Sequence, residues 1–247
     1  MHKPTHLLID GDIYLYEATT ATERAVDYGN DNWVLSANLA ESKELFTLMI
    51  DQIVDDIDPD ASMTICLSDK GNFRKQLSDT YKSQRKAQRK PLIFPELKKW
   101  VMENYKTVML PNLEADDVMG IMATNPMPLC DYIIVSTDKD LQTIPGKLYR
   151  QGKIVTITEQ EADAYWLTQA LTGDTTDGYK GCPGCGPVGA KKALGSVPSW
   201  SAVLQTYQKA GLTYDEALLN TRFARILRAS DWDHDKQAVK LWEPANG

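Results

Sequence analysis

The stretch THLLIDGD, residues 5–12, joins a short apolar run to two carboxylates, Asp10 and Asp12. A run of this length that ends in polar residues is typical of a buried β-strand. Two further runs have the same form, SMTICLS at residues 62–68 and DYIIVST at residues 131–137, and each leads directly into an aspartate. In a parallel sheet the carboxyl ends of the strands meet at one edge, where the functional crevice of α/β proteins lies. We therefore expect these acids to lie together.

Helical patterns separate these strands. In LAESKELFTLMIDQIVDDI, residues 39–57, apolar side chains recur at helical spacing, and ADDVMGIMAT, residues 115–124, is also expected to be helical. Strands that alternate with helices indicate an α/β fold, in which a mostly parallel central sheet is flanked by helices.

After about residue 158 the pattern becomes helical. The expected helices cover residues 159–173, 189–195, 199–210 and 214–229. We therefore expect an α/β catalytic domain over residues 1–160 and a small helical region over residues 161–247. Near the end of the chain, Asp231, Asp233 and Asp235 alternate as metal ligands can, but no apolar strand leads into them, and we assign them to a surface loop.

The composition is that of a folded protein outside the membrane. Of the 247 residues, 43% are hydrophobic, which is enough for a sizeable core. No apolar run approaches the ~20 residues of a membrane span, and the N-terminus lacks the apolar stretch of a signal peptide. Four cysteines fit a reducing compartment. A cytoplasmic location is expected, that of the host cell if a phage encodes the chain.

Acidic residues form clusters along the chain. Together with Asp12, the candidate ligands are Asp10, Asp69, Glu114, Asp116, Asp117, Asp138, Asp140, Asp174 and Asp177. Carboxylates that converge repel one another, and a divalent cation relieves the repulsion. Mg²⁺ prefers oxygen ligands, and two such ions ~3.5–4 Å apart serve to activate water and to stabilise the leaving oxygen in phosphodiester hydrolysis. Each cluster alone could consist of turn or cap residues, but their placement after three predicted strands favours a metal site.

Residues 70–90 have the opposite charge. Eight of them are Lys or Arg and only Asp79 is acidic, although the net charge of the chain is −7. In a helix the cations would form two adjacent rows, made of Lys82, Lys86, Lys90, Arg85 and Arg89. Such a basic arch can bind a phosphate backbone; the alternative is an ordinary solvated helix face. Tyr81 could stack on a base or pack inside the protein.

The stretch GCPGCGPVGAKKAL, residues 181–194, allows three interpretations. Cys182 and Cys185 form the C-x-x-C of a redox or zinc site, and the glycines match a dinucleotide-binding pattern. A glycine turn before a lysine-bearing helix can also hold a phosphate backbone. The dinucleotide pattern requires a preceding strand, but the preceding residues are polar. A zinc site requires two more nearby ligands, which the sequence does not offer.

We therefore favour a helix–hairpin–helix turn over about residues 173–195. In this interpretation glycines let the backbone approach a phosphate and lysines supply charge. The residues concerned are Gly184, Gly186, Gly189, Lys191 and Lys192.

Taken in order, the motifs LLIDGD, Asp69 with FRKQLSDTYKSQR, LEADD, STDKDLQ and GDTTDGYKGCPGCGPVGAKKAL resemble those of the 5′-nuclease superfamily. That superfamily includes flap endonucleases, the 5′-nuclease domain of bacterial DNA polymerase I and phage 5′→3′ exonucleases. The resemblance covers most of residues 5–195, and the chain is most similar to the 5′→3′ exonucleases of short-tailed phages. It implies a PIN-like α/β fold.

The resemblance also implies roles for matching residues. Around a first metal ion it places Asp10, Asp69, Glu114 and Asp116, with Asp117 acting through water; around a second it places Asp138, Asp140, Asp174 and Asp177. Lys82 matches a lysine that contacts the scissile phosphate, Arg74 and Arg85 match basic residues near it, and Tyr81 matches a residue that stacks near the 5′ end. Lys86 and Arg89 continue the basic stripe. The glycine hairpin would hold duplex DNA, and in some members it binds K⁺.

The implied function is metal-dependent hydrolysis of phosphodiester bonds from the 5′ end of DNA, at ends, nicks or flaps, with Mg²⁺ as the cofactor and Mn²⁺ as a substitute. RNA in RNA–DNA hybrids would be cut as well. One alternative is a PIN-type ribonuclease, which lacks the glycine hairpin and the basic arch. The other is a non-catalytic DNA-binding module, against which the complete set of acids argues.

Overall fold

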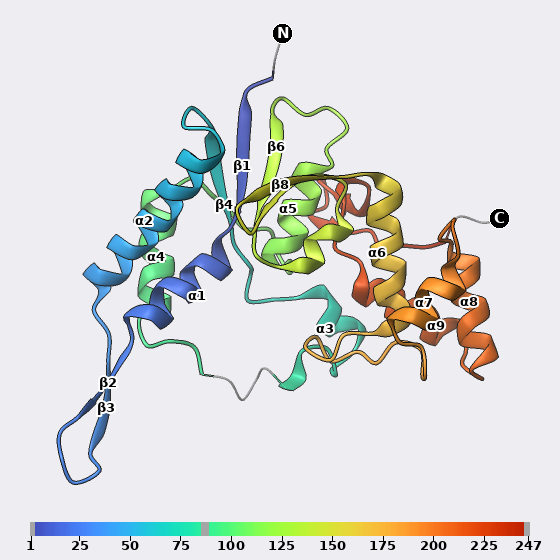
Figure 1. Cartoon of the computed structure of the whole chain (residues 1–247), viewed down its shortest axis with the longest axis horizontal. Helices are drawn as coiled ribbons and strands as arrows, with labels where there is room; N and C mark the ends of the chain where they lie inside the picture. The colour runs from blue at the N-terminus through green and yellow to red at the C-terminus, as the bar shows by residue number, and fades with distance from the viewer. Residues whose placement is uncertain (1–2, 85–88, 245–247) are drawn as a thin grey trace.

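The computed structural model describes residues 3–84 and 89–244, and its centre is a six-stranded sheet (Figure 1). The strand order is β5–β4–β1–β6–β7–β8. The bounds are β1 Thr5–Asp10, β4 Ser62–Cys66, β5 Thr107–Val108, β6 Asp131–Val135, β7 Gly146–Arg150 and β8 Lys153–Ile157. Neighbouring strands are parallel except β7 and β8, which are antiparallel. The predicted mostly parallel sheet is confirmed.

Helices surround this sheet. They are α1 Gly11–Thr22, α2 Leu39–Ile57, α3 Phe73–Leu77, α4 Phe94–Asn104, α5 Ala115–Ala123, α6 Glu159–Thr172, α7 Pro187–Leu194, α8 Trp200–Lys209 and α9 Tyr214–Ala224. The 3₁₀ helices are η2 Lys139–Thr143 and η3 Ala229–Asp231, and the small hairpins are β2 Arg24–Asp27 with β3 Trp33–Ser36 and β9 Trp232–Asp233 with β10 Ala238–Val239. The sequence predicted α2 with these bounds, whereas α9 ends five residues before the predicted end at 229. In the described part of the chain, no helix combines the length and apolar character that crossing a membrane requires.

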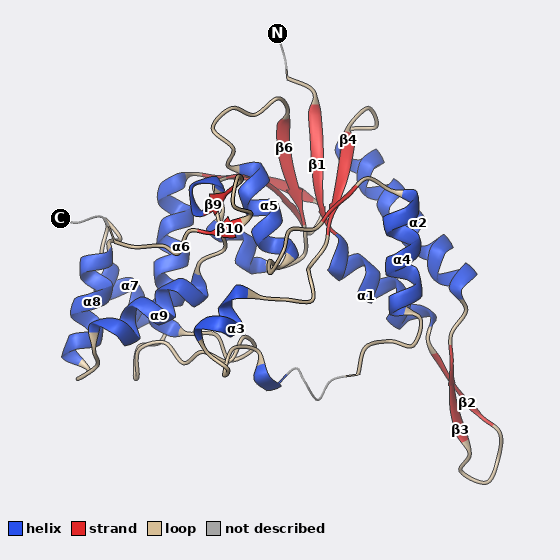
Figure 2. Ribbon diagram, turned by 180° about the vertical axis from the view of Figure 1, so that it is seen from behind, coloured by secondary structure: helices blue, strands red, loops and turns tan. Residues whose placement is uncertain are grey.

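The two faces of the sheet carry separate cores. Leu7 and Ile9 of β1 pack with α1, α2 and α4, whereas Leu8 packs on the opposite face with α5. This alternation follows from the two-residue period of a strand. Because both faces are covered (Figure 2), the central strands consist of apolar runs, which is why the sequence revealed them.

A third core joins helices α6 to α9 beside the sheet (Figure 2). The chain then returns to the sheet, because Ile226, Leu227 and Trp232 pack in the same core as α5. A domain boundary near residue 160 stays a prediction. With that boundary, residues of the C-terminal region would complete the core that lies between α5 and the sheet. The prediction that Asp231 lies in a surface loop is wrong. Asp231 is buried and accepts hydrogen bonds from Arg225 Nε and Arg228 N, both at 2.9 Å.

The strand order places the carboxyl ends of the predicted strands side by side. β1 lies between β4 and β6, so the carboxyl ends of the three predicted strands are neighbours. α1 begins directly after β1, and the turn depends on Gly11. A Cβ atom at this position would lie 2.5 Å from Ile65 Cγ2 and 2.8 Å from the Cys66 carbonyl oxygen. Glycine therefore lets the chain that carries Asp10 and Asp12 pass against β4.

We expect the substitution Gly11→Ala to lower the free energy of unfolding by about 1–3 kcal/mol, because the added methyl group overpacks a site closed by the buried Ile65 and Leu67 side chains and the Cys66 carbonyl. Urea denaturation followed by circular dichroism measures this change. Gly189→Ala is the matched control, since a Cβ in α7 would lie 3.6 Å from Cys185 Sγ; it should stabilise by up to about 1 kcal/mol. Equal stability of the Gly11→Ala variant and the wild type would contradict the proposed close approach.

Candidate active site

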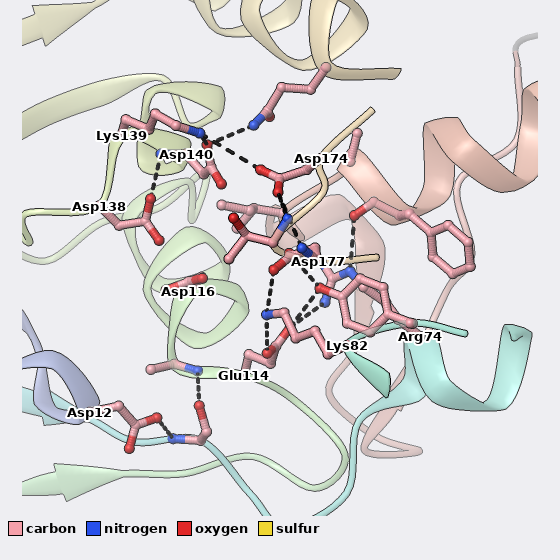
Figure 3. A pocket seen from close by; sticks show the side chains of 18 of the residues that line it. Asp12, Arg74, Lys82, Glu114, Asp116, Asp138, Lys139, Asp140, Asp174 and Asp177 are labelled. Atoms are coloured by element: carbon pink, nitrogen blue, oxygen red, sulfur yellow. Dashed lines mark hydrogen bonds and ion pairs between the residues drawn. The ribbon is translucent and has the colours of Figure 1, made fainter. Parts of the chain in front are cut away.

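A cavity of about 320 Å³ opens at the carboxyl edge of the sheet (Figure 3). Its acidic lining residues are Asp10, Asp12, Glu114, Asp116, Asp138, Asp140, Asp174 and Asp177. They come from the ends of β1 and β6, the starts of α1 and α5, and the loop after α6. The convergence predicted from the sequence is confirmed for these eight carboxylates.

Helix starts position several of these acids. Asp10 accepts a hydrogen bond from Ile13 N at 3.4 Å at the start of α1, and Asp138 accepts one from Asp140 N at 2.8 Å at the start of η2. Glu114 is the N-cap of α5. The structural and functional interpretations of these acids are therefore compatible, because an acid that caps a helix can also face the cavity.

Burial makes the charged forms of these acids costly. Asp10 is 2% exposed, and burial raises its pKa to about 7 although Ser136 donates a hydrogen bond to its carboxylate at 2.7 Å. Asp12 and Asp138 raise the pKa of Asp10 further by repulsion. Burial, followed by the charges of Asp10 and Asp138, also raises the pKa of Asp116. Lys82 acts on Asp116 in the opposite direction, but its charge does not outweigh burial and repulsion there.

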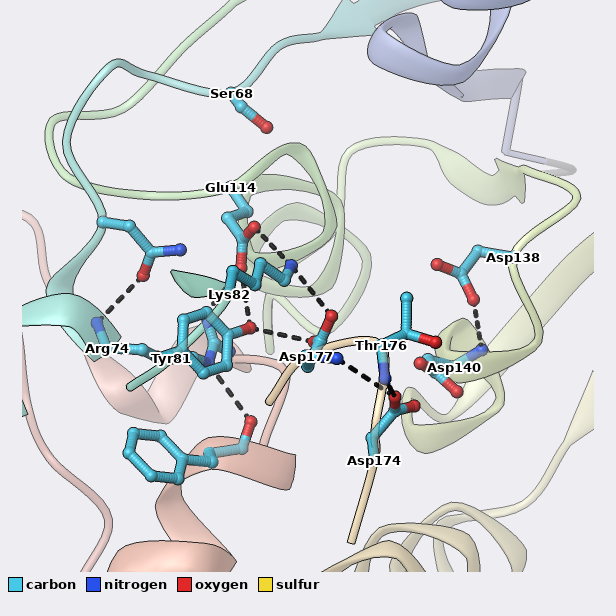
Figure 4. Close-up of polar contacts among 12 residues, drawn as sticks. Ser68, Arg74, Tyr81, Lys82, Glu114, Asp138, Asp140, Asp174, Thr176 and Asp177 are labelled. Atoms are coloured by element: carbon cyan, nitrogen blue, oxygen red, sulfur yellow. Dashed lines mark hydrogen bonds and ion pairs between the residues drawn. The ribbon is translucent and has the colours of Figure 1, made fainter. Parts of the chain in front are cut away.

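Lys82 supplies positive charge on one side of the cavity (Figure 4). Its Nζ lies 2.6 Å from Glu114 Oε1 and 3.4 Å from Asp177 Oδ1. Burial alone would raise the pKa of Glu114, but the charges of Lys82 and Arg74 outweigh burial and hold this pKa at about 2. The Lys82 backbone has a φ of 50° and its N–H donates to the Asp177 carbonyl at 2.8 Å. The ammonium group is therefore held inside the cavity, as its predicted role requires.

Arg74, which lines the cavity, forms a buried ion pair with Asp117. Arg74 Nη1 and Nη2 lie 2.7 and 2.8 Å from the two Asp117 oxygens, and Arg74 also donates to the carbonyls of Phe223 and Arg225. Asp117 is fully buried and accepts a further hydrogen bond from Leu227 N at 3.0 Å. This geometry disagrees with the predicted water-mediated metal role of Asp117, whereas Arg74 also lines the cavity, so its predicted place near the scissile phosphate stays a prediction. Both groups join α3, α5 and the C-terminal segment.

Tyr81 is a packing residue, which corrects the predicted base stacking. It is 2% exposed, its ring stacks on Phe223 at 5.3 Å, and its hydroxyl donates to Glu114 and Asp177. In contrast, the ring of Tyr16 is 51% exposed. It lines a neighbouring cavity that also contains Asp12, and the sequence analysis did not single it out.

Asp69 is not one of the described residues that line the cavity. Its carboxylate accepts a hydrogen bond from Asn112 N at 2.8 Å, and backbone donors of this loop lower its pKa. Ser68 lines the cavity instead and donates its N–H to Asp12 Oδ2 at 3.0 Å. Asp12 thus contributes an acid beside β4 where the sequence analysis expected Asp69.

The basic segment is not one continuous helix in its described part. α3 ends at Leu77, and the left-handed backbone of Lys82 breaks a helical path. Arg85 and Lys86 lie outside the described residues. Arg89 pairs with Glu23, with Nη1 at 2.9 Å from Oε2. Their predicted DNA contacts stay predictions.

The glycine-rich turn lies between α6 and α7. Gly184 has a φ of 74°, and added Cβ atoms at Gly184 and Gly186 would meet no atom within 4 Å, so this backbone is accessible. Lys191 and Lys192 are exposed on α7. Cys182, in contrast, is buried in the core of the helical region. The arrangement is the one expected for a phosphate-binding hairpin.

The donor chemistry of the cavity suits a hard divalent cation. Among the described residues, no three His, Cys, Asp or Glu side chains already surround a common point closely enough to enclose an ion. Mg²⁺ keeps several water ligands and needs few direct protein contacts. Oxygen donors with raised pKa values, such as Asp10, Asp116 and Asp140, therefore fit a hydrated divalent ion.

The sequence analysis missed further lining residues. Lys139, Gln169 and Thr176 all line the cavity. Lys139 stands within the motif STDKD between two predicted ligands, and this placement was the available signal. Gln169 lies on α6, and its position in the cavity depends on the packing of α6 against η2.

We expect Asp117→Asn to lower the free energy of unfolding by about 3–5 kcal/mol, because it removes the bidentate partner of the buried Arg74 charge and leaves only Glu114, 3.5 Å from Nη1. Asp138→Asn is the matched control, since an amide oxygen can still cap η2, and its effect should stay within about 0.5 kcal/mol. Chemical denaturation of both variants without divalent ions measures the contrast. Similar small effects at both positions would contradict the structural role of Asp117.

Comparison with known proteins shows the family of the chain. The profile of the family described as 5′-3′ exonuclease, N-terminal resolvase-like domain, matches residues 5–168. The exodeoxyribonuclease of Enterobacteria phage T3 is 29% identical over 96% of this chain and 92% of its own length. The exonuclease of Escherichia phage T7 is 28% identical over 96% of this chain and 93% of its own length.

A similar fold occurs in a solved structure. The flap endonuclease of bacteriophage T5, crystallised as a pseudo-enzyme–product complex with DNA and metal ions, matches with a TM-score of 0.65 and 12% identity. The match covers 89% of this chain and 88% of that chain. From the family profile and the phage relatives we conclude that the chain belongs to the 5′-3′ exonuclease family.

Proposed function

We propose that the acidic cavity is the active site at which this 5′→3′ exonuclease hydrolyses phosphodiester bonds of DNA. The observation that carries the proposal is the convergence of eight carboxylates in one cavity, where burial raises the pKa values of Asp10, Asp116 and Asp140. Buried acids of this kind are costly for a fold. A divalent cofactor and an anionic substrate would give them a function.

Two Mg²⁺ ions are the proposed cofactor, and Mn²⁺ is expected to replace them. One group of acids contains Asp10, Asp12, Glu114 and Asp116, and the other contains Asp138, Asp140, Asp174 and Asp177. Divalent ions bound there would supply the charge that activates water and stabilises the leaving oxygen. Asp69 and Asp117 are not included in the proposed ligand set, because neither of them lines the cavity and Asp117 is fully buried against Arg74.

The residues of the chain orient this chemistry. Ser136 holds the Asp10 carboxylate through a hydrogen bond of 2.7 Å. Tyr81 donates to Glu114 and Asp177, which keeps both carboxylates beside Lys82. Lys82 lies within the cavity as a cation that can bind the scissile phosphate.

The proposed DNA-binding surface continues along the α6–α7 turn. Here an accessible backbone at Gly184 and Gly186 precedes the N-terminus of α7, an arrangement that favours a phosphate group. Gly189, Lys191 and Lys192 of α7 extend this surface, and K⁺ binding at the turn remains part of the proposal. Arg85, Lys86 and Arg89 would add charge from the basic arch. The T5 complex with DNA supports the assignment of DNA as partner.

The proposed substrates are 5′ ends, nicks and flaps of DNA, and the RNA strand of RNA–DNA hybrids. The relatives from phages T3 and T7 support exonuclease action. A PIN-type ribonuclease and a non-catalytic DNA-binding module gain no support from these relatives. A cytoplasmic location and a division into two domains near residue 160 are carried forward as parts of the proposal.

We expect Asp138→Asn to slow cleavage of a 5′-labelled DNA duplex in Mg²⁺ by about 10²-fold or more, because it removes a charged ligand at the reacting centre. Affinity for the same duplex in Ca²⁺ should persist. The control is Asp131→Asn at the opposite end of β6, where Asp131 pairs with Lys147 at the surface. Product lengths on blunt, nicked and 5′-flap DNA and on a hybrid define the substrates. Undiminished cleavage by the Asp138→Asn variant would refute the assigned active site.

The raised pKa of Asp10 predicts a pH dependence of stability in EDTA. Its usual pKa is 3.8 and its pKa in the fold is about 7, so between these values the folded state binds more protons than the unfolded state. Stability from this group is therefore complete below pH 3.8 and is lost as the pH rises through 7. The free energy of unfolding of the wild type should fall relative to Asp10→Asn over this range, and Ca²⁺ should restore it. Parallel pH profiles for the two proteins would contradict the shift.

A further inference from the structure

Lys139 lies in the part of the acidic cavity that contains Asp140 and Asp174. Its Nζ lies 2.8 Å from Asp140 Oδ1 and 3.7 Å from Asp174 Oδ2 (Figure 3). These two acids come from different segments, η2 and the loop after α6. Lys139 therefore bridges them in the way that Lys82 bridges Glu114 and Asp177 on the other side of the cavity.

The two lysines differ in how firmly they are held. The Lys82 side chain is 11% exposed, whereas that of Lys139 is 56% exposed and extends from the rim. Asp140 Oδ1 also accepts a hydrogen bond from Gln169 Nε2 at 2.7 Å, so Asp140 keeps a neutral partner when the lysine leaves. A long, flexible and exposed side chain can turn outward at little cost, because lysine carries its charge on a four-carbon stem.

We propose that Lys139 is a displaceable counter-cation, which neutralises Asp140 and Asp174 in the metal-free protein and turns to a substrate phosphate when a divalent ion takes its place. This inference rests on the proposed function, in which both acids belong to the second-ion group. An ammonium group and a divalent ion cannot both remain on Asp140 Oδ1, since they repel each other at such short distances. The ammonium at the rim would then face the phosphate backbone of bound DNA.

Removal of the competing charge should tighten metal binding. Exposed ion pairs contribute about 0.2–1 kcal/mol, so Lys139→Gln should bind Mn²⁺ about 1.4- to 5-fold more tightly than the wild type in calorimetric titration without DNA. Lys139→Arg keeps the charge and should retain the wild-type dissociation constant. Lys209→Gln is the matched control, because Lys209 is an exposed residue at the end of α8 that does not line the cavity, and this substitution should change nothing.

DNA binding gives a second, independent measurement. In Ca²⁺, the slope of log K against log salt concentration should fall in magnitude by about one for Lys139→Gln, because one phosphate contact is lost. Lys139→Arg and Lys209→Gln should keep the wild-type slope. Circular dichroism melts establish that each variant is folded.

The results separate this inference from the function on which it rests. Unchanged or weaker Mn²⁺ binding by folded Lys139→Gln, or tighter binding by Lys139→Arg, would overturn the role of Lys139 while leaving the metal site intact. A wild-type slope for Lys139→Gln would overturn the phosphate contact. If neither the wild type nor any variant binds Mn²⁺, the proposed metal function itself fails.

Discussion

The repulsion among carboxylates at one edge of the sheet is the constraint on which the site depends. Asp10 is almost fully buried at the end of β1, with Asp12 and Asp138 close enough to raise its pKa. Backbone groups oppose this repulsion, since Asp10, Glu114 and Asp138 each stand at the start of a helix. Helix N-termini favour negative charge. The parallel sheet thus brings acids together and also supplies the helix starts that make their proximity tolerable.

Positive side chains compensate the remaining charge in two layers. Arg74 forms the rear layer at the buried wall of the cavity, pairs with Asp117 and donates to backbone carbonyls of the C-terminal segment. A buried pair of this kind is held in place, because removing either partner leaves an uncompensated charge. Lys82 forms the layer that faces the cavity, where its ammonium contacts Glu114 and Asp177. The rear layer fixes the position of α5, and the front layer provides a cation that a substrate phosphate can reach.

The sequence revealed the elements whose burial is visible as a pattern. β1, β4, β6 and α2 were predicted because apolar runs or helical spacing mark them. The edge strand β8 was not predicted, although its sequence KIVTI is rich in β-branched residues, because only Ile157 of its five residues is buried and no buried apolar run marks it. The resemblance separated Asp116, beside the metal, from Asp117, acting through water, but the ion pair of Asp117 with Arg74 was not predicted, since successive residues of a helix point to different faces and the sequence does not say what meets each face.

The packing role of Tyr81 could not be predicted from the sequence for a related reason. Its packing partner Phe223 comes from α9, at the far end of the chain, and only the tertiary fold brings the two rings together. The same applies to Asp69, whose carboxylate turns to Asn112 in a neighbouring loop. A local motif could indicate that an acid belongs near the site, but the direction of its side chain depends on partners contributed by other segments.

The loop after α6 shows how the two halves of the site are joined. The two ends of this loop pass close to each other at Gly173 and Gly181. A Cβ atom on either glycine would lie 2.3 Å from a backbone atom of the opposite end. The Asp177 carbonyl accepts the Lys82 N–H, and Gln84 donates to carbonyls of Thr175 and Thr176. Backbone hydrogen bonds therefore connect the acids of this loop to the segment that carries the cavity lysine. Any displacement of that segment must also move Asp177, so the cation and the acid that it neutralises are positioned as one unit.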